Sequence, residues 1–159
     1  MKKSLMLCSA AVLLFNALLV GKAQKTSTPL TAVEGEVVRS VKEKKPEWSY
    51  KSVTPVYENE EVIIQQWTLG EHIVKVSIVP HDSHQGAATA MRKFAARVGP
   101  TEGVKNMGDE AYVYKMRRSV VFRKGKFMIY ISALTTGTVD EFALGEEFAK
   151  LVADALRNH

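Results

Sequence analysis

The sequence predicts an α+β domain in which helices cover a largely antiparallel six-stranded sheet. Residues 108–134 alternate apolar and polar side chains with the period of two that is typical of strands, and tight turns divide them into three. A second group of three alternating segments lies within residues 48–79. Because strands joined by short turns pair antiparallel, the expected order is helix, three strands, helix, three strands, helix.

The first 23 residues have the features of a secretory signal peptide. Lys2 and Lys3 precede an apolar run over residues 5–20, and small residues end the segment at Ala23. The run is shorter than the roughly 20 apolar residues of a spanning helix, and Asn16 interrupts it. We therefore predict cleavage after Ala23, a mature chain of 136 residues in the periplasm or outside the cell, and no stable membrane anchor after cleavage.

Charge and cysteine content argue against nucleic-acid binding, thiol chemistry and lipid anchoring. The signal peptide holds three of the 22 basic residues and none of the 17 acidic ones, so the net charge falls from +5 to +2. A nearly neutral domain gives little support for nucleic acid as a partner, and we predict none. The single cysteine, Cys8, lies in the signal peptide, which excludes disulfide and thiol chemistry from the mature domain. Most of the apolar run follows Cys8, which disfavours a lipid anchor there.

The mature chain is predicted to begin with a flexible lead-in, residues 24–30, followed by one domain over residues 31–159. Thr31 and Glu34 match a capping box, in which each side chain bonds to a backbone N–H of the first turn. A helix should start there and end before Pro46. Its apolar side repeats every four residues: Val33, Val37 and Val41.

Three strands should follow this helix. Their expected ranges are 48–57, 61–69 and 72–79. The predicted turns are residues 58–60 and 69–71. Pro55 has no N–H to donate, so it predicts that the first strand is an edge strand or a broken one.

The second half of the chain repeats this order. A helix with apolar residues at spacings of three and four is expected over residues 83–98, and the alternating residues 108–134 follow. Turns are predicted near residues 116–119 and at 124–125. Residues 138–141 match a second capping box, which should start a last helix that runs nearly to the C-terminus.

The segments GDEAYVY (108–114) and SVVFRKGKFMIYIS (119–132), followed by a capped helix, resemble a module of uncharacterised secreted bacterial α+β proteins. The element order also resembles the fold of the PsbP subunits of photosystem II. The motifs cover about the last third of the chain, and the rest matches by element order alone. The resemblance implies a non-catalytic binding or assembly domain that acts through protein contacts. No functional motif of that family is present, so no functional residue carries over.

Two histidines and a carboxylate, His81, Asp82 and His84, lie between the third strand and the second helix. They could begin a metal site that takes a further ligand such as His72, although their spacing is not that of a standard zinc motif. In the alternative interpretation Asp82 caps the helix, Gln85 occupies its third position, and both histidines are exposed. No cofactor is predicted.

Other catalytic patterns are missing from the sequence. The mature chain has no cysteine nucleophile, no G-x-S-x-G elbow and no glycine-rich phosphate loop. Adjacent acidic pairs do not suggest the convergent carboxylates of a glycosidase. Among the acidic residues, Asp109 at a strand mouth is expected to hold a turn. The basic residues of segment 115–126 should divide between the two ends of one strand and serve as solvated turn residues.

Aromatic residues suggest a binding surface. Tyr112, Tyr114 and Tyr130 are predicted to share one sheet face and, with Trp67, to line a groove for a ligand, unless they form the floor under a helix. The leading hypothesis is a non-catalytic secreted or periplasmic binding or assembly domain that contacts a protein or a small amphipathic ligand. The alternatives are a metal-dependent enzyme centred on the two histidines of segment 81–84, and a structural or stress-related envelope protein without a small ligand.

Overall fold

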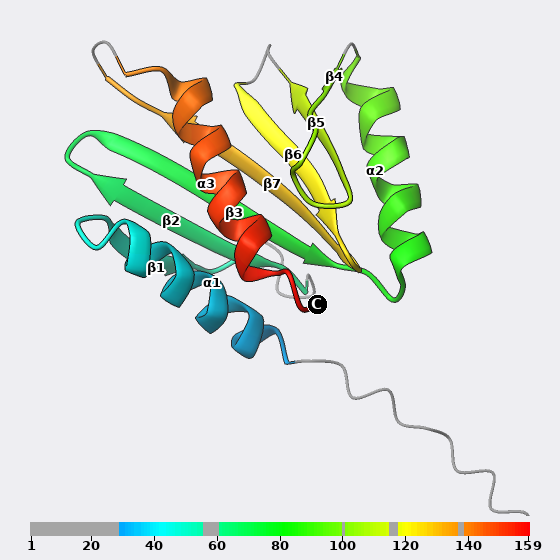
Figure 1. Ribbon diagram of the computed structural model, residues 1–159, viewed down its shortest axis with the longest axis horizontal. Coiled ribbons are helices and arrows are strands. Elements are labelled where there is room, and N and C mark those ends of the chain that lie inside the picture. The colour runs from blue at the N-terminus through cyan, green and yellow to red at the C-terminus, as the bar shows by residue number, and fades with distance from the viewer. Residues whose placement is uncertain (1–28, 56–60, 100, 115–117, 137–138) are drawn as a thin grey trace, which may run out of the picture.

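The computed structural model describes residues 29–55, 61–99, 101–114, 118–136 and 139–159. These residues form three helices and one seven-stranded antiparallel sheet, which confirms the α+β class (Figure 1). The helices are α1 (Leu30–Lys44), α2 (His84–Val98) and α3 (Glu141–Ala155). The strands are β1 (Ser49–Val53), β2 (Ile63–Leu69), β3 (His72–Pro80), β4 (Glu102–Gly103), β5 (Glu110–Tyr114), β6 (Ser119–Lys124) and β7 (Phe127–Leu134).

The strand order across the sheet is β1-β2-β3-β7-β6-β5-β4. Each half of the sheet is thus a meander, and the two halves join where β3 pairs with β7. The predicted count of six strands is wrong by one, because β4 pairs with the outer edge of β5 through Glu102 and Gly103. Two residues, one of them glycine, are too few to show an alternating pattern.

The core lies between α1, α3 and the face of the sheet that we call the front face (Figure 1). Large buried side chains line this face: Trp67, Val74, Val76, Ile78, Phe122, Phe127, Ile129 and Ile131. The ring of Phe148 in α3 has its centroid 4.9 Å from that of Trp48 and 6.1 Å from that of Trp67. The predicted apolar side of α1 is confirmed, since its three valines are fully buried.

The capping box predicted for α1 is wrong. The helix begins at Leu30 after Pro29, and no side chain caps it. Glu34 instead accepts hydrogen bonds from the hydroxyls of Tyr50 and Ser52, the latter at 2.8 Å. Burial and the Glu34 carboxylate raise the pKa of Tyr50 to about 12. The glutamate therefore links α1 to the edge strand β1.

The caps of α2 and α3 also differ from the predicted ones. Ser83, not Asp82, caps α2, because its hydroxyl accepts from the Gly86 N–H at 3.0 Å. Asp140 caps α3 by accepting from the Phe142 N–H at 2.8 Å. Thr138, the predicted cap of α3, lies outside the described residues.

Turns and edges follow the prediction where the structure describes them. A turn joins β2 to β3 at residues 70–71, within the predicted range. Another joins β6 to β7 at residues 125–126, one residue later than predicted. The strand β1 is an edge strand and ends at Val53, as Pro55 suggests. The predicted turn at residues 58–60 and the first half of the one near 116–119 lie outside the described residues.

Asp109 holds the turn between β6 and β7, as expected. Its carboxylate accepts from the Gly125 N–H at 2.8 Å and from the Arg123 guanidinium at 2.9 Å, and the Lys124 ammonium lies 3.4 Å away. Its own N–H donates to the Arg123 carbonyl at 2.8 Å. These bonds fix the start of β5 against the hairpin.

Replacing Asp109 with asparagine should lower the free energy of unfolding by about 1–3 kcal/mol near neutral pH, since a charge-assisted hydrogen bond is lost and its partners stay half-buried. Burial acts to raise the pKa of Asp109, but the Gly125 N–H and the Lys124 and Arg123 charges together lower it below its ordinary value. A carboxyl whose pKa falls on folding stabilises the native state above its unfolded pKa of about 3.9, and this contribution is lost as pH falls through the folded pKa.

Urea denaturation of both proteins over a range of pH should therefore show a stability difference that is constant near neutrality and shrinks below about pH 4. The matched control is Asp154→Asn, whose carboxylate makes an exposed ion pair with Arg157 at 2.8 Å within one helical turn. This control variant should lose less than about 0.5 kcal/mol of unfolding free energy. A difference for Asp109→Asn that persists unchanged into the acid range would contradict the role assigned to this carboxylate.

Candidate functional site

The second face of the sheet, which we call the back face, carries the side chains that point away from α1 and α3. Directly paired residues of antiparallel strands project from the same face, so the register defines rows across it. The first row is Lys51, Gln66, Lys75, Ser132, Ser119 and Tyr114. On one side of it lie Val53, Ile64, Ser77, Tyr130, Val121 and Tyr112, and on the other lie Ser49, Thr68, Ile73 and Leu134.

The back face is only partly covered. Ser119 and Val121 in β6 are buried, whereas the other residues of these rows are half-buried or exposed. The helix α2 packs on this face against β6 and β7, and its Phe94 ring lies 6.2 Å from the Tyr130 ring. In the described part of the chain, the half formed by β1, β2 and β3 is thus left without a helix layer of its own.

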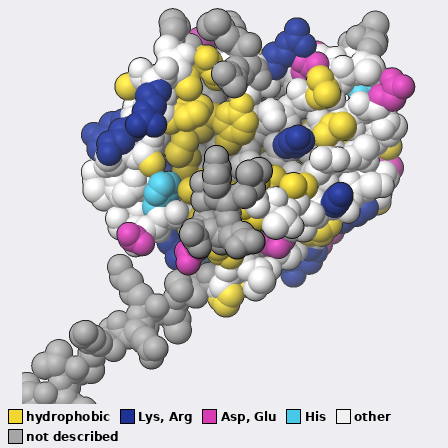
Figure 2. Space-filling view, turned by 180° about the vertical axis from the view of Figure 1, so that it is seen from behind, with side chains coloured by type: hydrophobic (Ala, Val, Ile, Leu, Met, Phe, Trp, Pro, Cys, Tyr) yellow, Lys and Arg dark blue, Asp and Glu magenta, His cyan; other side chains and the backbone are white. Residues whose placement is uncertain are grey.

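Figure 2 shows the molecule from the side of the back face, with hydrophobic side chains gathered in the upper part of the view. Where no grey atoms lie in front, basic side chains lie well inside the face, and most of the acidic ones lie nearer its margins. Leu134 is the most exposed of the large hydrophobic residues in the described segments, at 60%, and it pairs with Ile73. The back face therefore combines an apolar surface with basic side chains.

The three tyrosines of the sequence prediction lie together on this face. Tyr112, Tyr114 and Tyr130 are all half-buried, and Tyr112 and Tyr130 lie in one row with Val121 between them. Their role in binding a ligand stays a prediction.

Trp67 does not join the tyrosines, which corrects the predicted groove. It pairs with Val74 on the front face, is fully buried, and has its ring 5.0 Å from that of Tyr50. The strand pattern of β2 alone does not reveal which of its two faces turns toward the helices, because both contain apolar residues.

Two tyrosine hydroxyls are engaged within the sheet. Tyr112 donates to Glu110 at 2.8 Å, and the Tyr130 and Ser119 hydroxyls share a hydrogen bond of 2.6 Å. The bond to Glu110, followed by burial, raises the pKa of Tyr112 above its ordinary value. The phenol of Tyr112 therefore stays protonated near neutral pH, and it offers aromatic surface to a partner rather than acid–base chemistry.

The predicted metal ligands are not joined by a further ligand. His84 is exposed, and His81 is half-buried and donates its N–H to the Lys126 carbonyl at 2.9 Å. His72 lies at the opposite end of β3, roughly 27–30 Å along the strand from His81 at about 3.3 Å per residue. Among the described residues, no group of three or more His, Cys, Asp or Glu could hold a metal ion. A site of His81, Asp82 and His84 is therefore not supported.

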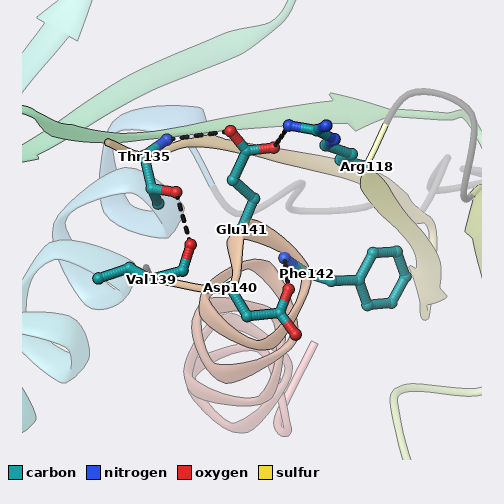
Figure 3. A pocket seen from close by; sticks show the side chains of 6 residues that line it. All are labelled: Arg118, Thr135, Val139, Asp140, Glu141 and Phe142. Carbon is teal, nitrogen blue, oxygen red and sulfur yellow. Dashed lines mark hydrogen bonds and ion pairs between the residues drawn. The ribbon is translucent and has the colours of Figure 1, made fainter. Parts of the chain in front are cut away.

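A pocket of about 490 Å³ lies at the start of α3 (Figure 3). There Glu141 accepts from the Arg118 guanidinium and from the Thr135 N–H, and the Thr135 hydroxyl donates to the Val139 carbonyl at 2.8 Å. The bond from Arg118, followed by that from Thr135, lowers the pKa of Glu141. Because these groups bond to one another, they tie the end of β7 to the start of α3, and the described residues that line the pocket present no nucleophile paired with a base.

Sequence reasoning missed four back-face residues. The half-buried Ile73 pairs with the exposed Leu134, and Lys51 and Lys75 lie in one row on either side of Gln66. The alternation of each strand places these residues opposite its core-facing positions, which is a signal in the sequence. Their association depends on the pairing of β1, β2, β3 and β7, which no local pattern specifies.

Comparison of the chain with protein-family models, curated proteins and solved structures gave no match. The resemblance to the PsbP subunits thus stays a prediction. None of the helices in the described segments has the length and apolar character needed to span a membrane.

Proposed function

We propose that this protein is a non-catalytic binding or assembly domain of the periplasm or the extracellular space, and that its back face is the contact surface. The observation that carries the proposal is the half of the sheet formed by β1, β2 and β3, which has no helix layer in the described residues and borders the exposed Leu134 of β7. Apolar side chains that gather on one face of a domain, rather than lying scattered over it, are typical of an interaction site. The signal peptide predicted from residues 1–23 supports the compartment.

A protein partner fits the back face better than a small amphipathic ligand does. Small ligands bind in concave sites that bury most of their surface. The back face is a row of strands bordered on one side by α2, so it offers contact from one direction only. Protein interfaces are commonly of this open kind, with an apolar centre and a polar rim.

Site-specific photo-crosslinking tests the proposal in cells that export the protein. A photoreactive phenylalanine analogue at Leu134 should give a discrete protein adduct, because this side chain is exposed at the proposed contact. The matched control is the same analogue at Lys150, which is exposed on α3. Adducts of equal yield from both positions, or none from Leu134, would overturn the proposal. An adduct with only the mass of a small molecule would favour the small ligand.

A further inference from the structure

Among the described residues, no charged partner meets the two lysines on the half of the back face formed by β1, β2 and β3, which we call the uncovered half. Lys51 and Lys75 are both exposed, and neither forms an ion pair with any described residue. They lie two strands apart in one row, at roughly 10 Å for a strand spacing of about 4.8 Å. The bordering helix α2 has exposed Arg92, Lys93 and Arg97 and contains no acidic residue. A partner on this surface therefore meets positive charge.

The uncovered half has the width of one helix. An α-helix with its side chains is about 10–12 Å across, and it packs about 10 Å above a sheet. Two strand spacings, from β1 to β3, span a similar width. On the front face two helices, α1 and α3, lie beside each other over the sheet (Figure 1), whereas α2 is the only helix of the described residues that packs on the back face. A second helix beside α2 would complete this layer.

We infer that the partner contributes an amphipathic helix with acidic flanks, which lies over β1, β2 and β3 beside α2. Its apolar stripe packs on Ile64, Ile73 and Leu134, and its carboxylates pair with the two lysines. This inference rests on the proposed function and names the class of partner. A second copy of this chain is a poorer occupant, because face-to-face pairing would bring lysines against lysines.

Designed peptides test the inference directly. The first probe is a fluorescently labelled peptide with leucines at helical spacing and glutamates on both flanks, and the second differs only in having lysines in place of the glutamates. Fluorescence anisotropy with the exported protein should show at least about tenfold tighter binding of the acidic peptide, a difference of about 1.4 kcal/mol. The preference should weaken as salt is added.

Charge reversal supplies the decisive comparison. The double variant Lys51→Glu and Lys75→Glu should lose the preference for the acidic peptide and gain one for the basic peptide. The control double variant Lys44→Glu and Lys150→Glu makes the same change of net charge on the exposed sides of α1 and α3, and should keep the original preference. Circular dichroism should show an unchanged fold in both, because none of the four lysines is buried.

Several results would overturn the inference. They are equal binding of the two peptides, binding of neither, and a preference that the variant at Lys51 and Lys75 retains. Binding of the protein to phosphatidylglycerol vesicles but not to the acidic peptide would replace the helix with a membrane surface, and sedimentation as a dimer blocked by Lys75→Glu would replace it with a second copy. The Leu134 crosslink is independent of charge, so the proposed function can survive the failure of this inference.

Discussion

Replacing Phe148 with alanine is expected to lower the free energy of unfolding by about 3–5 kcal/mol, the range for a large aromatic removed from a core. The side chain is fully buried where α3 meets the sheet. Its ring contacts Trp48 edge-on and Trp67 at a tilt, and the Lys45 ammonium lies 5.8 Å from its centroid. The substitution leaves a cavity between three elements that cannot close without moving α3. Urea denaturation followed by tryptophan fluorescence measures the loss.

Phe142→Ala is the matched control for this prediction. Phe142 belongs to the same helix but is only half-buried at its first turn. The expected loss is less than half that of Phe148→Ala, because less apolar area leaves water at this position. Equal losses for the two variants would show that the core is not centred on the contact of Phe148 with the two tryptophans.

The sequence was sufficient for the element types and for most boundaries, because apolar residues in β3, β7 and α1 follow clear periods of two or about four. It was insufficient for the caps. Thr31 and Glu34 have the spacing of a capping box, yet the Glu34 carboxylate bonds to Tyr50 and Ser52 of β1 instead. The bonds of Glu34 to two hydroxyls of β1 thus replace the local bonds of the capping box. A pattern of neighbouring residues cannot reveal such a tertiary contact.

The candidate site was predictable only where alternation within single strands determines it. Alternation places the three tyrosines opposite the positions of β5 and β7 that are occupied by aliphatic residues or phenylalanine, so taking those positions as the core side puts the tyrosines on one face. The association of Lys51 with Lys75 requires the register of three strands, and the exposure of Leu134 requires the position of α2. Trp67 shows the limit most clearly, since its strand presents apolar residues on both faces and only the packing of α1 and α3 selects between them.

Gly108→Ala is expected to lower the free energy of unfolding by about 2–5 kcal/mol. Gly108 has a φ of +61°, in the left-handed region where an L-residue costs about 1–2 kcal/mol. A Cβ there would also lie 2.3 Å from the Arg123 carbonyl oxygen and 3.0 Å from the Phe122 ring. The carbonyl cannot retreat freely, because it accepts from the Asp109 N–H at 2.8 Å, and such overpacking typically adds about 1–3 kcal/mol.

Gly70→Ala separates the strain of a positive φ from the steric clash of a Cβ with its neighbours. Gly70 has a nearly equal φ of +57°, but a Cβ at this position meets nothing within 4 Å. Gly70→Ala should therefore lower the free energy of unfolding only by the backbone strain, about 1–2 kcal/mol. Thermal and urea unfolding of both variants gives the difference, which isolates the close approach of residue 108 to β6. Equal losses of stability in the two variants would mean that the chain around residue 108 moves to make room for the Cβ. Because Gly108→Ala and Asp109→Asn disturb the same hairpin contact, their double variant should lose less stability than the sum of the single losses.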